Sequence, residues 1–117
     1  MATKLVFVLA ICALAAVVCA KELYSDKYDN INIDAILAND SVRNEYYNCM
    51  LDFGPCVTPD AAYFKGLLGE IIITNCRKCT DKQRYMFKQV LKHYTLKEPQ
   101  KWQELVLKVL KELPKLK

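Results

Sequence analysis

Apolar residues recur at helical spacing through most of the chain, and no long segment alternates between apolar and polar positions as a strand would. The cleanest pattern lies in "EPQKWQELVLKVLKELPKLK", where Pro99 begins a predicted helix and Pro114 ends it. Its apolar stripe consists of Trp102, Leu105, Val106, Val109, Leu110 and Leu113. This stripe predicts a helix with one face turned toward a core.

Two further helices have clear starting signals. Thr58 can act as an N-cap, followed by Pro59 at the first helical position and Asp60 in the first turn. The apolar face of this helix consists of Phe64, Leu67, Leu68, Ile71 and Ile72. Thr80 and Gln83 fit a capping box at the start of the next helix. Its candidate inward residues are Tyr85, Met86, Val90, Leu91 and Tyr94.

The first half of the chain predicts two shorter helices. One covers residues 31–40, is capped by Asn30 or Asn32, and places Ile33, Ile36 and Leu37 on one side. The other covers residues 41–53, is capped by Asp40 or Ser41, and stops at "GPC". Its apolar positions are Val42, Tyr46, Cys49, Met50 and Phe53. We therefore expect an all-α bundle of five to six short helices.

Residues 1–20, "MATKLVFVLAICALAAVVCA", have the features of a secretory signal peptide. A lysine near the start precedes an apolar run, and Val18 and Ala20 fit a cleavage site after Ala20. The run is short for a membrane span. We therefore expect a secreted, extracellular protein whose residues 21–117 form a single helical domain.

Charge is unevenly distributed over the expected mature chain. Residues 21–60 carry 3 basic and 8 acidic groups, whereas residues 61–117 carry 13 basic and 5 acidic groups. A basic half can indicate nucleic acid or an anionic membrane as partner. Because these lysines fall on the outer faces of amphipathic helices in a secreted chain, we interpret them as a solvated surface and expect no nucleic-acid partner.

Four cysteines remain after the leader is removed: Cys49, Cys56, Cys76 and Cys79. An even number in a small secreted chain indicates disulfides, and three pairings are open. "GP" at residues 54–55 reverses the chain between the first two cysteines, and the last two flank a break between helices. We expect Cys49–Cys56 and Cys76–Cys79, the second with a distorted turn because an intact helix holds positions i and i+3 too far apart.

The motif "CRKC" is also compatible with redox chemistry or zinc binding. A redox site needs the first cysteine at a helix N-terminus, where its pKa is depressed, yet here a predicted helix precedes the motif. His93, the only histidine, lies beside Lys92 and Tyr94 on a predicted helix, and Asp26 and Asp29 lie in a polar segment. These groups do not converge on a reaction, so we expect no enzyme activity, no metal site and no cofactor.

Four segments together resemble the insect chemosensory proteins, the OS-D-like family. They are "DKYDNINIDAILAND", "NCMLDFGPCVTPD", "NCRKCTDKQ" and "EPQKWQEL", in this order and spacing, and the resemblance covers residues 24–106. The chain departs from the family pattern in an extra residue, Val57, in Gly69 where a proline is usual, and in a different C-terminal tail.

The resemblance implies a secreted all-α bundle around an apolar ligand channel, with two local disulfides. It implies a carrier of small hydrophobic ligands such as semiochemicals, long-chain fatty acids, esters or alcohols, acting as a monomer, with a membrane receptor as a further candidate partner. The residues expected to contact the ligand are Ile36, Tyr46, Met50, Phe64, Leu67, Ile71, Met86, Val90 and Trp102, with Tyr24 and Tyr28 of the N-terminal segment at the entrance.

An alternative is a secreted amphipathic protein that acts on membranes or on a protein partner, in an antimicrobial or developmental signalling role. The basic second half and the strongly amphipathic helix from Trp102 to Leu113 favour it. Saposin-like membrane proteins, however, have six cysteines that bridge distant helices, whereas four local ones are expected here.

Overall fold

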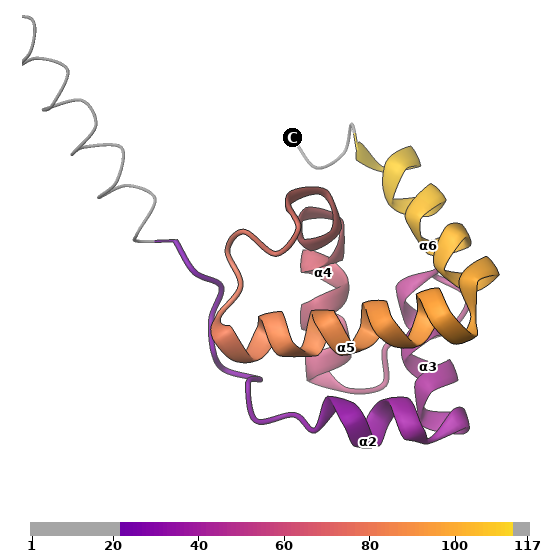
Figure 1. Cartoon of the computed structure of the whole chain (residues 1–117), viewed down its shortest axis with the longest axis horizontal. Coiled ribbons are helices and arrows are strands. Elements are labelled where there is room, and N and C mark those ends of the chain that lie inside the picture. Colours follow the sequence, from indigo (N-terminus) through magenta and orange to yellow (C-terminus); the bar gives the residue numbers. More distant parts are fainter. Residues whose placement is uncertain (1–21, 114–117) are drawn as a thin grey trace, which may run out of the picture.

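The computed structural model describes residues 22–113, which contain five α-helices and no strand. The helices are α2 (Ile33–Ala38), α3 (Asp40–Met50), α4 (Pro59–Thr74), α5 (Asp81–Lys97) and α6 (Pro99–Lys111), shown in Figure 1. The predicted all-α fold is confirmed. The predicted signal peptide and the helix end at Pro114 lie outside the described residues. No helix among residues 22–113 is long and apolar enough to cross a bilayer.

The helices contact one another in a closed ring. Helix α2 packs on α3, α3 on α4, α4 on α6, α6 on α5, and α5 returns to α2. In Figure 1, α5 crosses α4, with α2 on one side of it and α6 at its far end. Each helix buries only one stripe against its two neighbours, so the ring leaves its centre to be filled by side chains alone.

Most predicted helix starts are confirmed. The Oγ1 of Thr80 accepts from the backbone N–H of Gln83, and the side chain of Gln83 accepts from the backbone N–H of Thr80, which completes the capping box. Thr58 caps α4 with Pro59 in its first turn, and Asn32 caps α2. These caps satisfy backbone donors that have no partner within the helix.

The predicted cap of the second helix was wrong. Asn39, not Asp40 or Ser41, accepts from the backbone N–H of Val42, and α3 begins at Asp40. Asn39 also ends α2, with an extended backbone of φ −103° and ψ 110°. One extended residue therefore ends α2 and caps α3, which makes a sharp corner between them. The sequence pattern predicted each helix separately and did not indicate a shared cap.

The end of that helix was also predicted too late. Helix α3 stops at Met50, and Asp52 takes a left-handed conformation with φ 61°. The reversal at Asp52 turns Phe53 outward, where 73% of it is exposed, while Leu51 is 4% exposed and joins the core. Leu51 is therefore buried in the core, whereas helical periodicity had predicted that Phe53 would be.

Two other residues predicted to face inward are exposed. Tyr85 is 50% exposed and donates its hydroxyl to the carboxylate of Asp34 on α2. Leu110 is also 50% exposed, because the inward face of α6 is narrower than its apolar stripe and buries Leu105 and Val109. Helical spacing identifies an apolar face but does not give the width of the surface that covers it.

Both predicted disulfides are present. Cys49 pairs with Cys56 and Cys76 with Cys79, with Cα–Cα distances of 4.8 and 5.1 Å. The distorted turn expected before Cys79 is confirmed, since Asn75 and Cys76 adopt left-handed conformations with φ 53° and 64°. Each bridge closes a short loop at a corner between consecutive helices and so fixes the direction in which the chain leaves it.

The buried apolar residues form two clusters. The larger contains Tyr47, Leu51, Tyr94 and Leu105 from α3, α5, α6 and the turn after α3, with Trp102 packed against it. The smaller contains Ile71, Cys76 and Cys79, so the second disulfide is part of the core. Ring centroids of Tyr47 and Tyr94 lie 5.9 Å apart in a stacked arrangement.

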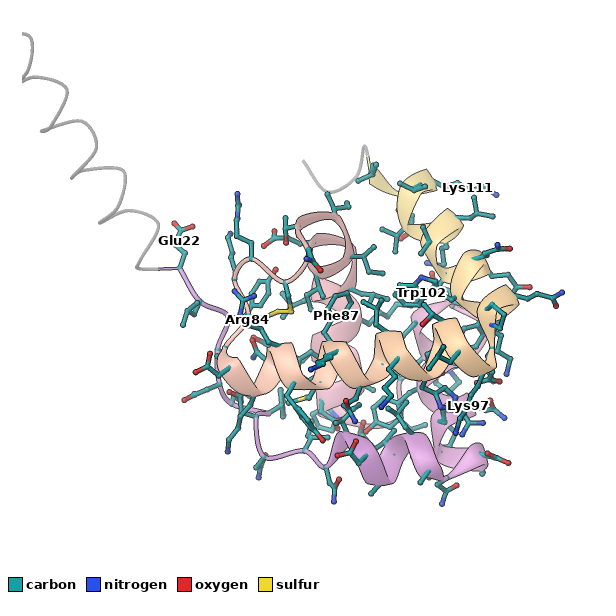
Figure 2. The ribbon with its side chains drawn as sticks, viewed as in Figure 1. Glu22, Arg84, Phe87, Lys97, Trp102 and Lys111 are labelled. Carbon is teal, nitrogen blue, oxygen red and sulfur yellow. A yellow bond between two sulfur atoms is a disulfide. The ribbon has the colours of Figure 1, made fainter. Side chains whose placement is uncertain are left out.

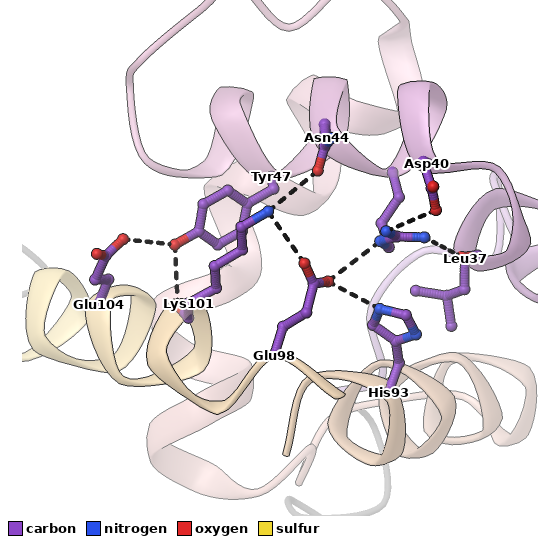
Figure 3. Close-up of polar contacts among 9 residues, drawn as sticks. Leu37, Asp40, Asn44, Tyr47, His93, Glu98, Lys101 and Glu104 are labelled. Atoms are coloured by element: carbon purple, nitrogen blue, oxygen red, sulfur yellow. Dashed lines mark hydrogen bonds and ion pairs between the residues drawn. The ribbon is translucent and has the colours of Figure 1, made fainter. Parts of the chain in front are cut away.

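A polar network joins four of the helices at one end of the ring. The side chain of Arg43 is 11% exposed; its Nη1 donates to the backbone O of Leu37 at 2.6 Å, and its Nη2 pairs with Asp40 at 2.9 Å. Its Nε lies 3.3 Å from Glu98 Oε2, an ion pair without hydrogen-bond alignment. Glu98, between α5 and α6, also meets His93 Nε2 at 2.9 Å and Lys101 Nζ at 3.1 Å (Figure 3).

The Thr80 cap generates a stability prediction. In Thr80→Ala, the capping hydrogen bond to Gln83 and the hydrogen bond from Thr80 Oγ1 to Asp29 are both lost. We expect the free energy of unfolding to fall by about 1–2 kcal/mol, measured by urea denaturation. Thr95→Ala is the matched control at an exposed position in the last turn of α5 and should change the free energy of unfolding by less than about 0.5 kcal/mol. Equal effects of the two substitutions would contradict the capping role.

The Glu98 carboxylate generates a pH prediction. Burial alone would raise the pKa of Glu98, but hydrogen bonds from His93 and Lys101 and the charges of Lys101 and Arg43 outweigh it, so the pKa lies below 4.5. Ionised Glu98 therefore stabilises the fold above about pH 4.5, and this contribution is lost as the pH falls through the lower folded pKa. Glu98→Gln should be less stable than wild type at pH 6, and the difference should shrink by pH 3.

Urea denaturation at each pH from 6 to 3 measures the free energy of unfolding of wild type and of Glu98→Gln. The control is Glu45→Gln, because Glu45 is exposed on α3 and makes no ion pair among the described residues. A gap between wild type and Glu98→Gln that stays constant from pH 6 to pH 3 would contradict the stabilising role of the ionised carboxylate.

Candidate functional site

An apolar cavity of about 150 Å³ lies at the centre of the helical ring. A single water needs about 10–15 Å³ on this measure, so the space is roughly ten times larger than one water requires. Its wall is built by Ile31, Ile33, Ile36, Leu37, Arg43, Tyr46, Tyr47, Met50, Asp60, Phe64, Leu68, Ile71, Gln83, Met86, Phe87, Val90, Tyr94, Trp102 and Leu105. These residues come from all five helices and the segment before α2.

Helical periodicity places the wall residues. Asp60, Phe64, Leu68 and Ile71 follow one face of α4, at spacings of three and four residues. Helix α5 contributes in the same way from Gln83 to Tyr94. Figure 2 shows Phe87 and Trp102 within the bundle, whereas Arg84 and Lys97 lie on its outside.

Most of the residues predicted to contact a ligand meet at this cavity. They are Ile36, Tyr46, Met50, Phe64, Ile71, Met86, Val90 and Trp102. The sequence pattern predicted only that these side chains face inward, and the cavity that they share is a feature of the tertiary structure.

Tyr24, Tyr28 and Leu67 do not line the cavity. The hydroxyl of Tyr24 donates to Glu70 Oε1 at 2.7 Å, and Tyr24 and Leu67 pack against the cluster that contains the Cys76–Cys79 bridge. Burial and the carboxylate of Glu70 raise the pKa of Tyr24. The ring of Tyr28 lies 5.2 Å from that of Tyr63. Tyr24 and Tyr28 are thus anchored along α4 and the second disulfide and are not part of the cavity wall.

Other wall residues were not predicted as ligand contacts. They are Ile31, Ile33, Leu37, Arg43, Tyr47, Asp60, Leu68, Gln83, Phe87, Tyr94 and Leu105. Several of the apolar residues in this set have the same helical spacing as the residues that were predicted. The sequence did not indicate Asp60 and Gln83 as wall residues, because both were already explained as parts of helix starts.

Tyr46 and Asp60 form a polar pair on the wall. The hydroxyl of Tyr46 donates to Asp60 Oδ2 at 2.6 Å, across from α3 to the first turn of α4. Burial and the adjacent carboxylate raise the pKa of Tyr46. Asp60 lies in the first turn of α4, where an acidic side chain interacts favourably with the positive end of the helix dipole. The pair places a negative charge and a phenol at the edge of an otherwise apolar space.

The remaining polar wall groups are held by protein partners. Gln83 is buried, and its amide nitrogen donates to the backbone O of Ser25 at 2.9 Å and to Asp29 Oδ1 at 3.0 Å. The hydroxyl of Tyr47 lies 3.0 Å from both the backbone O of Lys101 and Glu104 Oε2. Burial raises the pKa of Tyr94 to about 12, so its phenol stays neutral.

An open groove of about 480 Å³ adjoins the cavity. It shares Ile31, Ile33 and Met86 with the cavity wall. Its outer lining is polar and contains Asp29, Asn30, Asn32, Asp34, Asp81, Lys82 and Tyr85. The groove lies between the segment before α2 and the first turns of α5, and it gives the cavity a side that faces solvent.

All four cysteines of residues 22–113 are in disulfides. Within this range, no group of three His, Cys, Asp or Glu side chains is placed to hold a metal ion. What the described site offers is a mostly apolar wall with a few polar groups, an arrangement suited to binding.

Comparison with known proteins agrees with this geometry. The family model described as "Insect pheromone-binding family, A10/OS-D" matches residues 24–115. The chain is 37% identical over 105 residues to Allergen Tha p 1 of Thaumetopoea pityocampa, covering 90% of this chain and 82% of the allergen. It is 40% identical over 85 residues to the putative odorant-binding protein A10 of Drosophila melanogaster, covering 73% and 54% of the two chains.

Solved structures give the same result. A chemosensory protein in complex with bromo-dodecanol superposes with a TM-score of 0.69 at 40% identity, covering 74% of this chain and 85% of the other. The solution structure of CSPsg4 superposes with a TM-score of 0.57 at 38% identity, covering 76% and 83%. The ring of helices, the two local disulfides and these matches together show that the chain belongs to the A10/OS-D family of insect pheromone-binding, or chemosensory, proteins.

Proposed function

We propose that this protein is a secreted, extracellular carrier of small hydrophobic ligands for chemosensation or related transport. The ligand classes are semiochemicals and long-chain fatty acids, esters or alcohols. One observation carries the proposal: the helical ring encloses an apolar cavity larger than a close-packed core leaves. A family member of known structure was solved with a brominated C12 alcohol, which supports the same ligand chemistry.

Affinity in such a site comes from burying the ligand's chain. Each buried methylene contributes about 0.8 kcal/mol, and each extra methylene discriminates weakly. Met50 and Met86 on the wall have flexible thioether side chains that adapt to different shapes. We assign ligand contact to the predicted residues on the wall together with Leu37, Leu68 and Phe87. We assign Tyr24, Tyr28 and Leu67 to support of the fold.

The proposal is one of binding without catalysis, so it includes no cofactor and no metal. Its partners are the ligand and, as a candidate, a membrane receptor, and the carrier acts as a monomer. The alternative of membrane action has less support in the structure than in the sequence. Leu105 and Val109 of α6 are buried and Trp102 lines the cavity, so most of its amphipathic face is already covered.

Trp102 provides a direct binding assay because it is the only tryptophan in the chain and lies on the cavity wall. Bromine quenches indole fluorescence at short range, so a brominated C12 alcohol should quench Trp102 saturably. Bromoethanol at equal concentration should quench it only in proportion to concentration. C12–C18 alcohols or fatty acids should reverse the saturable part. Absence of saturable quenching in the purified, oxidised protein would rule out the carrier.

Filling the cavity should weaken binding without disturbing the outer surface. Val90→Phe adds an aromatic ring to the wall, and we expect the affinity for dodecanol to fall roughly tenfold or more. Leu107→Phe is the control, because Leu107 is 57% exposed on α6. Displacement of a fluorescent lipophilic probe measures both. Equal affinities in the two variants would place the ligand elsewhere.

A further inference from the structure

Two charged side chains lie on the cavity wall, Arg43 and Asp60. They differ in how their charge is balanced. Arg43 is paired with Asp40 at 2.9 Å and Glu98 at 3.3 Å, and it also donates to the backbone O of Leu37. Figure 3 shows Glu98 at the centre of this network. The guanidinium is thus already compensated by protein carboxylates, and recruiting it to a ligand carboxylate would add a third negative charge around it.

Asp60 has no cationic partner within 4 Å among the described residues. Its Oδ2 accepts a hydrogen bond from the hydroxyl of Tyr46 at 2.6 Å, a neutral donor. The tyrosine hydroxyl can also accept a hydrogen bond, and the carboxylate has a second oxygen. The pair can therefore receive a hydrogen bond from an alcohol or amide, while a ligand carboxylate placed there would meet a like charge.

The groove that adjoins the cavity is also negatively charged. Asp29, Asp34 and Asp81 line it against one lysine, Lys82. A smaller pocket that shares Met50 and Leu68 with the cavity contains Lys65 and Lys108. Both lysines pair with Asp52 and Lys108 also pairs with Glu112, so two carboxylates balance the two positive charges.

From these observations we propose that the cavity selects long-chain ligands with neutral head groups, such as alcohols, esters and amides, against long-chain carboxylates. The Asp60 carboxylate, hydrogen-bonded to Tyr46, provides the repulsion of a ligand carboxylate, and the acidic side chains of the groove increase that repulsion. The inference rests on the proposed carrier function and narrows its ligand class. Two charges of like sign at short range in a partly desolvated site repel far more strongly than they do in water. The chain's positive net charge, +4 in all, would act in the opposite direction.

The test compares ligands that differ only at the head group. Probe displacement at pH 7.5 is measured for dodecanol, methyl dodecanoate and dodecanoate, all built on a twelve-carbon chain. We expect the two neutral ligands to bind roughly tenfold or more tightly than dodecanoate. In Asp60→Asn, which keeps an acceptor for Tyr46, dodecanoate should gain affinity relative to methyl dodecanoate and close most of that gap.

The controls separate local charge from global charge. Glu45→Gln removes a carboxylate one position from Tyr46, on an exposed site outside the cavity wall, and should leave the ester-to-acid ratio unchanged. Raising the salt concentration should bring the affinities of wild type for methyl dodecanoate and dodecanoate closer together. Screening by salt weakens the repulsion between the ligand carboxylate and the partly exposed acidic groove. This second measurement needs no variant and remains informative if Asp60→Asn folds poorly.

The outcomes distinguish this inference from the carrier function itself. No displacement by any of the three ligands would overturn the carrier proposal. Displacement by all three with equal affinity in wild type would overturn the selectivity while leaving the carrier intact. An ester-to-acid ratio that Asp60→Asn does not change, in a folded variant that binds methyl dodecanoate normally, would also overturn the assignment to Asp60.

Discussion

The ion pair between Arg43 and Glu98 closes the ring of helices on which the rest of the structure depends. Glu98 lies at the junction of α5 and α6, and Arg43 reaches it from α3 while bonding the end of α2. Removing Glu98 would leave the buried Arg43 with the exposed Asp40 as its remaining carboxylate partner among the described residues, a larger cost than the loss of an exposed ion pair. The corner of α5 and α6 is therefore held in place by charge, and the wall residues Tyr94 and Trp102 on either side of it are fixed with it.

The other corners of the ring are fixed by covalent bonds and caps. Cys49–Cys56 holds the turn from α3 to α4, Cys76–Cys79 holds the turn from α4 to α5, and Asn39 joins α2 to α3. Rigid corners explain how a small chain keeps an interior space, because a cavity normally closes when its walls are free to move inward. The stability that a filled core would supply is replaced here by constraints at the junctions.

The wall is apolar in most places and charged in few, and this contrast connects the structure to ligand choice. Apolar contact provides affinity for any chain of suitable length, so it discriminates poorly among alcohols, esters and acids. Discrimination must come from the few polar groups, and their value depends on whether protein partners already compensate them. Protein carboxylates balance the charge of Arg43, whereas no cation pairs with Asp60 among the described residues. The proposed site is therefore negatively charged.

The sequence by itself determined the helices, most of their starting residues, both disulfides and the family. These are local properties: Thr58, Thr80 and the paired cysteines act on neighbours within a few residues. Tertiary structure decided which inward residues line the cavity, because Tyr24 and Leu67 share the helical signal or aromatic character of Tyr46 and Phe64 yet pack elsewhere. It also decided that Asp60 lies on the cavity wall, and that Phe53 and Tyr85 face solvent. Periodicity is a property of one helix, whereas a cavity depends on how several helices meet.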